Sequence, residues 1–218
     1  MTVTDARTDR TAPLPRAVAR RYRHRYAVLD VETTGLKPEQ GDRVLQIAIS
    51  LVNARGVVER SWSTYVDPLR DPGVVHVHGI TADRLAGAPT FAQIAPTVAK
   101  LLAGRVFVAH NARFDWTFIA SEMRAAGVAL PVRERLCTWK LARRLDLPVE
   151  NLKLSTLAAH WGIEQIRAHD AVDDTRVLVE VLREELCAAQ RGQVELPVVR
   201  VAPRGFLGRL LSRFRRAG

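Results

Sequence analysis

The stretch Tyr26-Ala27-Val28-Leu29-Asp30-Val31-Glu32-Thr33-Thr34-Gly35 places two carboxylates on a segment that otherwise has the composition of a buried strand. Alternation along a strand puts Asp30 and Glu32 on one face. Two neighbouring acids repel each other and lose hydration, so they need a shared proton or a cation, and a divalent metal is the commoner solution. An acidic strand end at the surface would explain the same residues without chemistry. The rest of the chain decides between these interpretations.

The segments around this stretch predict one α/β domain over residues 25–190. Apolar runs bounded by turn residues predict further strands at 44–52, 57–66, 105–109 and 132–136. Helical spacing predicts helices at 91–102, 114–126, 138–145, 157–161 and 171–190. The expected helix caps are Thr90, with Gln93 completing a capping box, Ser155 and Asp170.

The charge of the chain is concentrated at its ends. The formal net charge is +10, of which residues 1–26 carry +5 and residues 200–218 carry +6, leaving about −1 for the domain between them. Residues 1–24 have few apolar positions and are expected to be disordered. Residues 191–218 are expected to form a linker and a basic amphipathic segment. We expect these tails to act as electrostatic tethers.

The C-terminal amphipathic pattern leaves several roles open. A segment over 203–218 with apolar residues on one side and arginines on the other can lie on a membrane surface, dock on a partner, clamp nucleic acid or pack back on the domain. The peptide Gln193-Val194-Glu195-Leu196-Pro197 has a weak likeness to the short peptides by which replication proteins hold a sliding clamp.

Cysteine usage and hydropathy predict a cytoplasmic protein. Cys137 and Cys187 are far apart in the sequence and have no metal-ligand spacing, which fits a reducing compartment. We find no apolar run near the roughly 18 residues of a spanning helix and no apolar signal core at the N-terminus.

Two more acids are predicted to face inward. Asp115 falls in the first turn of a helix among large apolar residues, where it is either a helix-dipole partner or an inward ligand. In the last helix, a period of 100° per residue puts Asp174 on the apolar face, whereas Asp173 shares the polar face with Glu180 and Glu184. Asp173 is therefore expected to point outward and to be dispensable. His169 precedes this helix and is expected to lean over the inward region.

Four inward acids cannot remain unpaired in a protein core. They require roughly two divalent cations, and oxygen ligands with a nearby histidine favour Mg²⁺ or Mn²⁺ over zinc. A paired site of this kind is typical of phosphodiester chemistry.

Three ordered motifs resemble those of the DEDDh 3′–5′ exonucleases, a family that includes the proofreading epsilon subunits of bacterial replicative polymerases. These motifs are Asp30-Val31-Glu32-Thr33-Thr34-Gly35, His110-Asn111-Ala112-Arg113-Phe114-Asp115 and His169-Asp170-Ala171-Val172-Asp173-Asp174. The resemblance extends to His78-Gly79-Ile80-Thr81 and to Leu152-Lys153-Leu154-Ser155-Thr156-Leu157, and it covers about 26–186.

The resemblance implies a ribonuclease-H-like α/β fold, with a mixed five-stranded sheet flanked by helices. It implies that Asp30, Glu32, Asp115 and Asp174 bind the metals and that His169 is the general base. The substrate contacts it implies are Thr33, Thr34, Gly35, Leu36, Ile80, His110 and Asn111, with Leu36 and Ile80 wedged against terminal bases. The sequence departs from the family pattern at Gln46, where many relatives carry glutamate.

The expected function is metal-dependent hydrolysis from the 3′ end of single-stranded DNA. Trimming of RNA 3′ ends is an alternative, because no residue recognisably reads a 2′-hydroxyl. A non-catalytic module that binds nucleic acid or a polymerase is a second alternative. All four acids and the histidine are present, which argues against that last alternative. A DNA polymerase or a sliding clamp is a candidate partner.

Overall fold

The computed structural model describes residues 12–201, so the parts of the expected tails at 1–11 and 202–218 lie outside the described residues. The strands are β1 (Tyr26–Thr33), β2 (Val44–Val52), β3 (Val58–Tyr65), β4 (Val106–Ala109), β5 (Glu134–Cys137) and β6 (Val199–Arg200). The helices are α1 (Arg16–Arg21), the 3₁₀ turn η1 (Pro38–Gln40), α2 (Val75–His78), α3 (Ala82–Leu85), α4 (Phe91–Leu102), α5 (Arg113–Ala125), α6 (Thr138–Leu145), α7 (Leu154–His160) and α8 (Ala171–Arg191).

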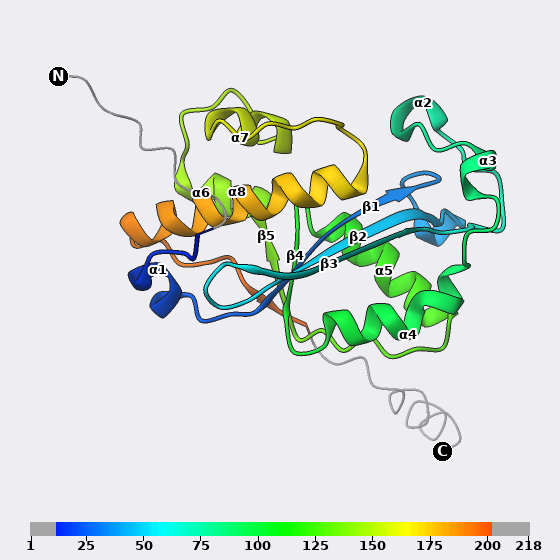
Figure 1. Ribbon diagram of the computed structural model, residues 1–218, viewed down its shortest axis with the longest axis horizontal. Coiled ribbons are helices and arrows are strands. Elements are labelled where there is room, and N and C mark those ends of the chain that lie inside the picture. Colours follow the sequence, from blue (N-terminus) through cyan, green and yellow to red (C-terminus); the bar gives the residue numbers. More distant parts are fainter. Residues whose placement is uncertain (1–11, 202–218) are drawn as a thin grey trace, which may run out of the picture.

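The strands form one mixed sheet in the order β3-β2-β1-β4-β5-β6 (Figure 1). The first three strands are an antiparallel meander, β4 and β5 run parallel to β1, and β6 is antiparallel to β5. Because β1 and β4 are parallel neighbours, their carboxyl ends open at the same edge of the sheet. This edge is where the acidic stretch of β1 ends.

Helices cover both faces of the sheet (Figure 1). On one face, Ala27 and Leu29 of β1 pack in a cluster with α4 and α5, which contribute Phe91 and Phe118. On the other face, Val28 packs in a second cluster with the apolar side of α8 and with α1 and α6. The alternation of β1 therefore directs Asp30 and Glu32, which follow Val28, to the α8 face.

The sheet has one more strand than expected. The two-residue strand β6 comes from the segment assigned to a linker, and Arg135 pairs with Val199. Val194, Leu196 and Val198 alternate along this segment and pack against the α8-side cluster. Because side chains alternate along an extended segment, these three residues share one face, and the burial of that face explains why the segment is ordered.

The segment 12–24 is also ordered, contrary to the expected disorder. Leu14, Val18 and Tyr22 recur every four residues and are buried against α8. The Arg183 side chain of α8 donates to the carbonyl oxygens of Ala12, at 2.5 Å, and of Gly56. The segment was expected to be disordered because it has few apolar residues, but those few all lie on one face and are buried together.

Several element ends follow the predicted caps, and one does not. Thr90 and Gln93 form the capping box of α4, and the Asp170 side chain caps α8 by accepting from the N–H of Val172 at 3.0 Å. Helix α7 begins at Leu154, before the predicted cap Ser155, because the Asn151 side chain accepts from the backbone just ahead of the helix.

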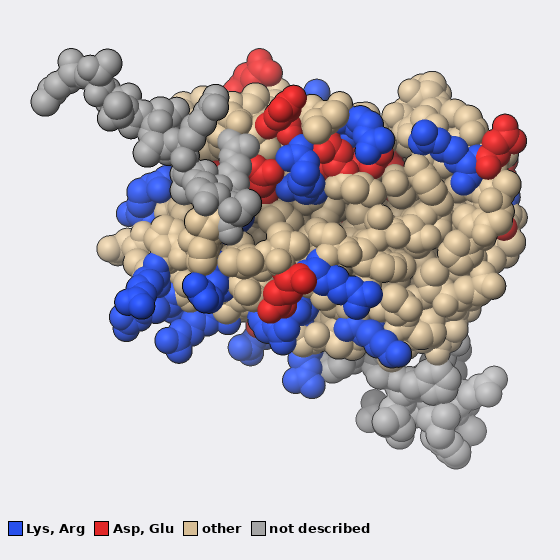
Figure 2. All heavy atoms as spheres, viewed as in Figure 1, with Lys and Arg blue, Asp and Glu red and all other residues tan. Residues whose placement is uncertain are grey.

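The exposed arginines of α1 mark one end of the molecule. Arg16, Arg20 and Arg21 are exposed, and Lys and Arg side chains gather over this end in Figure 2. Within residues 12–201, we find no helix both long and apolar enough to cross a bilayer. The expected membrane contact through 203–218 lies outside the described residues.

Candidate active site

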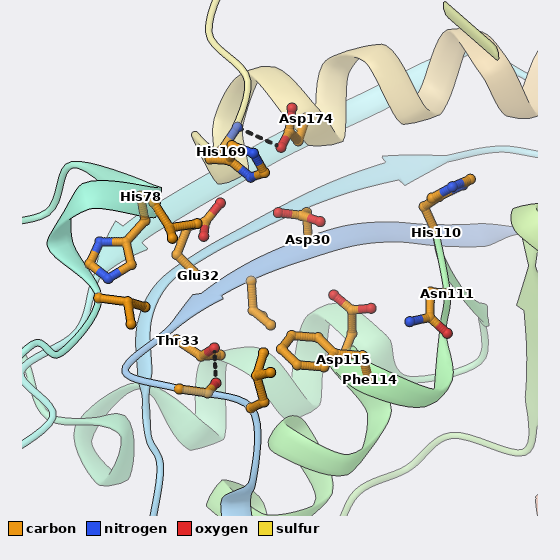
Figure 3. Close-up of a pocket in the computed structure, with 15 residues that line it drawn as sticks. Asp30, Glu32, Thr33, His78, His110, Asn111, Phe114, Asp115, His169 and Asp174 are labelled. Carbon is orange, nitrogen blue, oxygen red and sulfur yellow. Dashed lines mark hydrogen bonds between the residues drawn. The ribbon is translucent and has the colours of Figure 1, made fainter. Parts of the chain in front are cut away.

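The carboxyl end of β1 forms the floor of a pocket of about 380 Å³ (Figure 3). Asp30 and Glu32 project into it from the α8 face of the sheet, and both are partly buried. Strand alternation thus places them as the sequence predicts.

Helix α5 brings the third acid to the same pocket. The chain leaves β4 through His110 and Asn111, and Asn111 has a positive φ of 60° that turns the backbone into α5. Asp115 lies in the first turn of α5 and is 2% exposed. The parallel pairing of β1 with β4 brings this helix start next to Asp30.

Helix α8 supplies the fourth acid, and the loop just before it supplies the histidine. Asp174 Oδ2 accepts from the backbone N–H of His169 at 3.1 Å, and its Oδ1 accepts from the Gln165 side chain at 2.5 Å. His169 is exposed at the pocket wall and has a φ of +63°. Potential ligand atoms of Glu32, His169 and Asp174 all lie within 4.8 Å of one another.

The expectation for Asp173 is wrong in one respect. Its side chain points away from the pocket, but it is buried, with 6% exposed. The loop before α8 folds back over this side of the helix, and the Asp173 carboxylate accepts from the N–H groups of Ile166 and Arg167. A polar helix face is thus covered by a segment that periodicity cannot place.

Burial raises the pKa of all four acids, and repulsion from the other site acids adds to it at Asp30 and Glu32. Burial, followed by the charges of its acidic neighbours, holds the pKa of Asp30 well above its ordinary value. Burial and the nearby Asp174 raise the pKa of Glu32 to about 8. Burial raises the pKa of Asp115 to about 7, although N–H groups of Asp115 and Val31 oppose it. Burial also raises the pKa of Asp174 against its hydrogen bonds.

This donor set fits divalent cations. Four carboxylates converge from three elements, and their raised pKa values show that negative charge is costly there without a compensating positive charge. Carboxylate oxygens are the ligands that Mg²⁺ and Mn²⁺ prefer.

The turn after β1 forms one rim of the pocket. Thr33, Gly35 and Leu36 line it, and the Leu36 side chain is 76% exposed. Thr34 does not line it, because its hydroxyl donates to Asp42 at 3.1 Å. The Thr34 backbone N–H donates to the carbonyl oxygen of Arg43 at 2.9 Å. The substrate contact expected of the Thr33–Gly35 backbone stays a prediction.

The predicted wedge Ile80 is not at the pocket. It is 1% exposed and packs with Leu45 and Leu85 in a small cluster beneath the α2–α3 turn. The apolar residues of this region that do line the pocket are Val74 and Val77. The sequence analysis did not predict them; the one available signal was that Val77 lies directly before the motif His78-Gly79-Ile80-Thr81.

His110 lines the pocket, and both nitrogens of its ring form hydrogen bonds within the protein. Its Nδ1 lies 3.0 Å from the Thr138 hydroxyl, and its Nε2 lies 2.9 Å from the carbonyl oxygen of Leu152. Burial lowers the pKa of His110 to about 4, although the Leu152 carbonyl opposes this. His110 therefore joins β4 to α6 and to the segment before α7, and its ring nitrogens are not free for substrate.

Gln46, the departure from the family pattern, links β2 to α8. It is paired in register with Glu32, and its Oε1 accepts from the N–H of Ala171 at 3.2 Å. A neutral acceptor at this position still satisfies an N–H group of the first turn of α8.

Comparison with known proteins agrees with this geometry. A family model described as "Exonuclease" (RNase T) matches residues 27–182. The chain is 34% identical over 157 residues to the 3′-5′ exonuclease DinG of Bacillus subtilis, covering 71% of this chain and 17% of that protein. It is 32% identical over 160 residues to the DNA polymerase III subunit epsilon of Treponema pallidum, covering 72% and 74%.

A solved structure of exonuclease X in complex with 5′ overhanging duplex DNA shares the fold. Its TM-score is 0.61 at 24% identity, covering 78% of this chain and 98% of that one. The mixed sheet with four converging acids and a histidine is that of a DEDDh-type 3′–5′ exonuclease domain. The chain belongs to the RNase T exonuclease family.

Proposed function

We propose that the chain removes nucleotides from the 3′ end of single-stranded DNA with two bound Mg²⁺ or Mn²⁺ ions and His169 as the general base. The observation that carries this proposal is the convergence of Asp30, Glu32, Asp115 and Asp174 from β1, α5 and α8 into one pocket. A buried group of acids with no catalytic use would only destabilise the fold.

The four acids would hold the ions. When bound, divalent ions make water a stronger nucleophile at neutral pH and offset the charge that gathers on the phosphate. Burial raises the pKa of Glu32 to about 8 and that of Asp115 to about 7. A cation that binds these carboxylates near neutral pH would therefore displace protons from them.

His169 would accept the proton of the attacking water. Its ring stands in the pocket wall near Glu32, on an exposed loop from which a proton can leave to solvent (Figure 3). Histidine is the side chain that most often acts as a general base in enzymes. The water oxygen bonds to phosphorus, and the bond from phosphorus to the 3′ oxygen of the preceding nucleotide breaks. That oxygen takes up a proton from solvent and remains as the new 3′ hydroxyl, and a nucleoside 5′-monophosphate leaves.

The rim of the pocket would hold the terminal nucleotide. Leu36 and Val77 are exposed apolar side chains on its edge, as expected for stacking against a base. The pocket volume of about 380 Å³ is within the range of small-molecule sites, and it accommodates one nucleotide. RNA remains the alternative substrate, since nothing in the lining selects a deoxyribose.

A polymerase remains a proposed partner. The T. pallidum relative is named as a polymerase subunit, and this supports the proposal. Contact with a sliding clamp through 193–197 is not supported, because Val194 and Leu196 already pack against the domain and Arg144 donates to the Glu195 carbonyl oxygen at 2.9 Å.

The test uses a single-stranded DNA labelled at its 5′ end and an RNA of the same sequence, each with Mg²⁺, Mn²⁺ or EDTA. We expect a metal-dependent ladder that shortens from the 3′ end, stronger on DNA. Asp174→Asn should remove the ladder, whereas Glu184→Gln, an acid on the same helix outside the pocket, should keep it. An Asp174→Asn protein as active as the parent would show that the hydrolysis comes from elsewhere.

A further inference from the structure

Asp173 is an acid of the last motif that the proposed chemistry does not use. Its Oδ2 accepts from the N–H groups of Ile166 at 2.7 Å and of Arg167 at 2.8 Å. Its Oδ1 accepts from Arg176 Nε at 2.9 Å. The carboxylate thus bridges the loop before α8 and the helix itself.

Arg176 forms hydrogen bonds with the beginning of the same loop. Its guanidinium donates to the carbonyl oxygen of Glu164 at 2.5 Å and to Glu180 Oε1 at 2.9 Å, in addition to Asp173. One turn of α8 therefore holds the loop at 164, 166 and 167. These bonds involve charged groups, which makes them stronger than bonds between neutral groups.

The loop ends at His169, two residues after Arg167, the last loop residue that is hydrogen-bonded to Asp173. His169 has a φ of +63°, a conformation that is strained for a residue other than glycine and persists only where its surroundings enforce it. Its N–H donates to Asp174, which fixes the far end of the segment. The hydrogen bonds of Arg167 to Asp173 and of His169 to Asp174 thus fix the backbone on both sides of residue 168, and with it the position of the His169 imidazole.

We propose that Asp173 is a positioning residue that holds the loop 164–169 and thereby places the His169 imidazole in the pocket. The inference rests on the proposed function, in which His169 is the base.

The state of the Asp173 carboxyl agrees with this role. Burial acts to raise the pKa of Asp173, but the N–H groups of Arg167 and Ile166 and the Arg176 guanidinium outweigh it, and the pKa lies below its ordinary value. The group is therefore an ionised acceptor wherever the enzyme would work.

The variant Asp173→Asn keeps the shape and removes half of the acceptors. If the amide oxygen faces the loop, its NH₂ group meets the Arg176 donors, and the opposite rotamer places NH₂ against two backbone N–H groups. We expect kcat to fall about 10- to 100-fold, the scale of a misplacement near 1 Å, with KM changed by less than about threefold. Glu184→Gln removes an acid from the same helix and should change neither constant.

Hydrogen exchange measures the loop directly. In Asp173→Asn, the amides of Ile166 and Arg167 should exchange at least about tenfold faster, while β1 and β2 keep the protection of the parent. Unchanged exchange at these two amides would overturn the inference, because the loop would then be held by other contacts.

A double-mutant cycle separates positioning from a general loss of folded protein. If Asp173 acts through His169, then adding Asp173→Asn to His169→Ala should lower the remaining kcat by less than about twofold. A further loss as large as in the parent background would overturn the inference. A parent without metal-dependent hydrolysis would overturn the proposed function, and the assignment to His169 with it. An active parent with full additivity would overturn only the inference.

Discussion

Replacing Glu185 with methionine should stabilise the protein, and more so as the pH rises. Glu185 lies on α8 between Leu182 and Leu186 and is completely buried, and within residues 12–201 neither carboxyl oxygen has a hydrogen-bond partner. Burial, with a smaller contribution from the Cys137 thiol, holds the pKa of Glu185 well above its ordinary value. The folded protein therefore keeps a proton that the unfolded chain releases above about pH 4.5.

The magnitude has two parts. A buried polar group without a partner costs about 1–3 kcal/mol, and methionine removes this cost while filling a similar volume. The retained proton lowers the stability of the parent by up to about 1.4 kcal/mol per pH unit above pH 4.5, until the pH reaches the pKa of the folded state. The advantage of Glu185→Met should thus grow by up to about 2.3 kcal/mol between pH 4.5 and 6.5, because at pH 4.5 only half of the unfolded chains have released the proton.

Urea denaturation at pH 4.5, 5.5 and 6.5 measures this, with parent and variant compared at each pH. Other titrating groups cancel in the difference. Glu184→Met, one residue earlier and partly exposed, is the control and should show no such trend. A Glu185→Met protein that is less stable than the parent, or whose advantage is the same at all three pH values, would refute the reasoning.

Three further changes test other parts of the structure. Asp30→Asn should lower hydrolysis by more than about 10²-fold. In EDTA the variant should also be more stable than the parent at pH 8, by a difference that shrinks toward pH 4. The reason is that the raised pKa of Asp30 disfavours its ionised form in the folded parent, whereas the unfolded chain ionises freely above about pH 4. A thermal melt that ranks the two the other way would contradict this. Glu122→Gln should cost about 2 kcal/mol and lower Tm by about 4–8 °C, since the buried Glu122 pairs with the arginine before β2 at 2.8 Å; an unchanged Tm would mean that this pair contributes little. Gly73→Ala should destabilise the protein more than Gly79→Ala, because both have positive φ but only at Gly73 would a methyl group collide with the Thr34 carbonyl oxygen; equal melting temperatures would place the cost in the backbone angle alone.

Local periodicity predicted much of the fold. The alternation of β1 places Asp30 and Glu32 on one face, and the sequence bounds of β2, α4 and α6 agree with the structure. These elements have long apolar patterns or clear caps, so that neighbouring residues alone determine them. The convergence of the acids follows from the parallel pairing of β1 with β4.

The remaining features depend on contacts between distant residues. Helix geometry correctly turns Asp173 away from the pocket, but it cannot show that a loop returns to cover that face. The ring of His110 forms hydrogen bonds with Thr138 and Leu152, which lie 28 and 42 residues later in the chain. Ile80 is drawn into a cluster with Leu45 rather than the pocket. The contacts of His110 and Ile80 join residues far apart in the sequence and leave no pattern within a short window.

The order in which the acids occur along the chain has a consequence for synthesis. Asp30 and Glu32 are translated before His169 and Asp174, which lie about 140 residues later, just before and within the first turn of the last long helix. At about 5–20 residues per second, the ribosome needs about 7–28 s to extend the chain from the first acid to the last. During that interval no nascent chain contains a complete set of acids. The arrangement thus delays any nuclease activity beside the messenger and the ribosome until the domain is nearly finished, without a separate inhibitor.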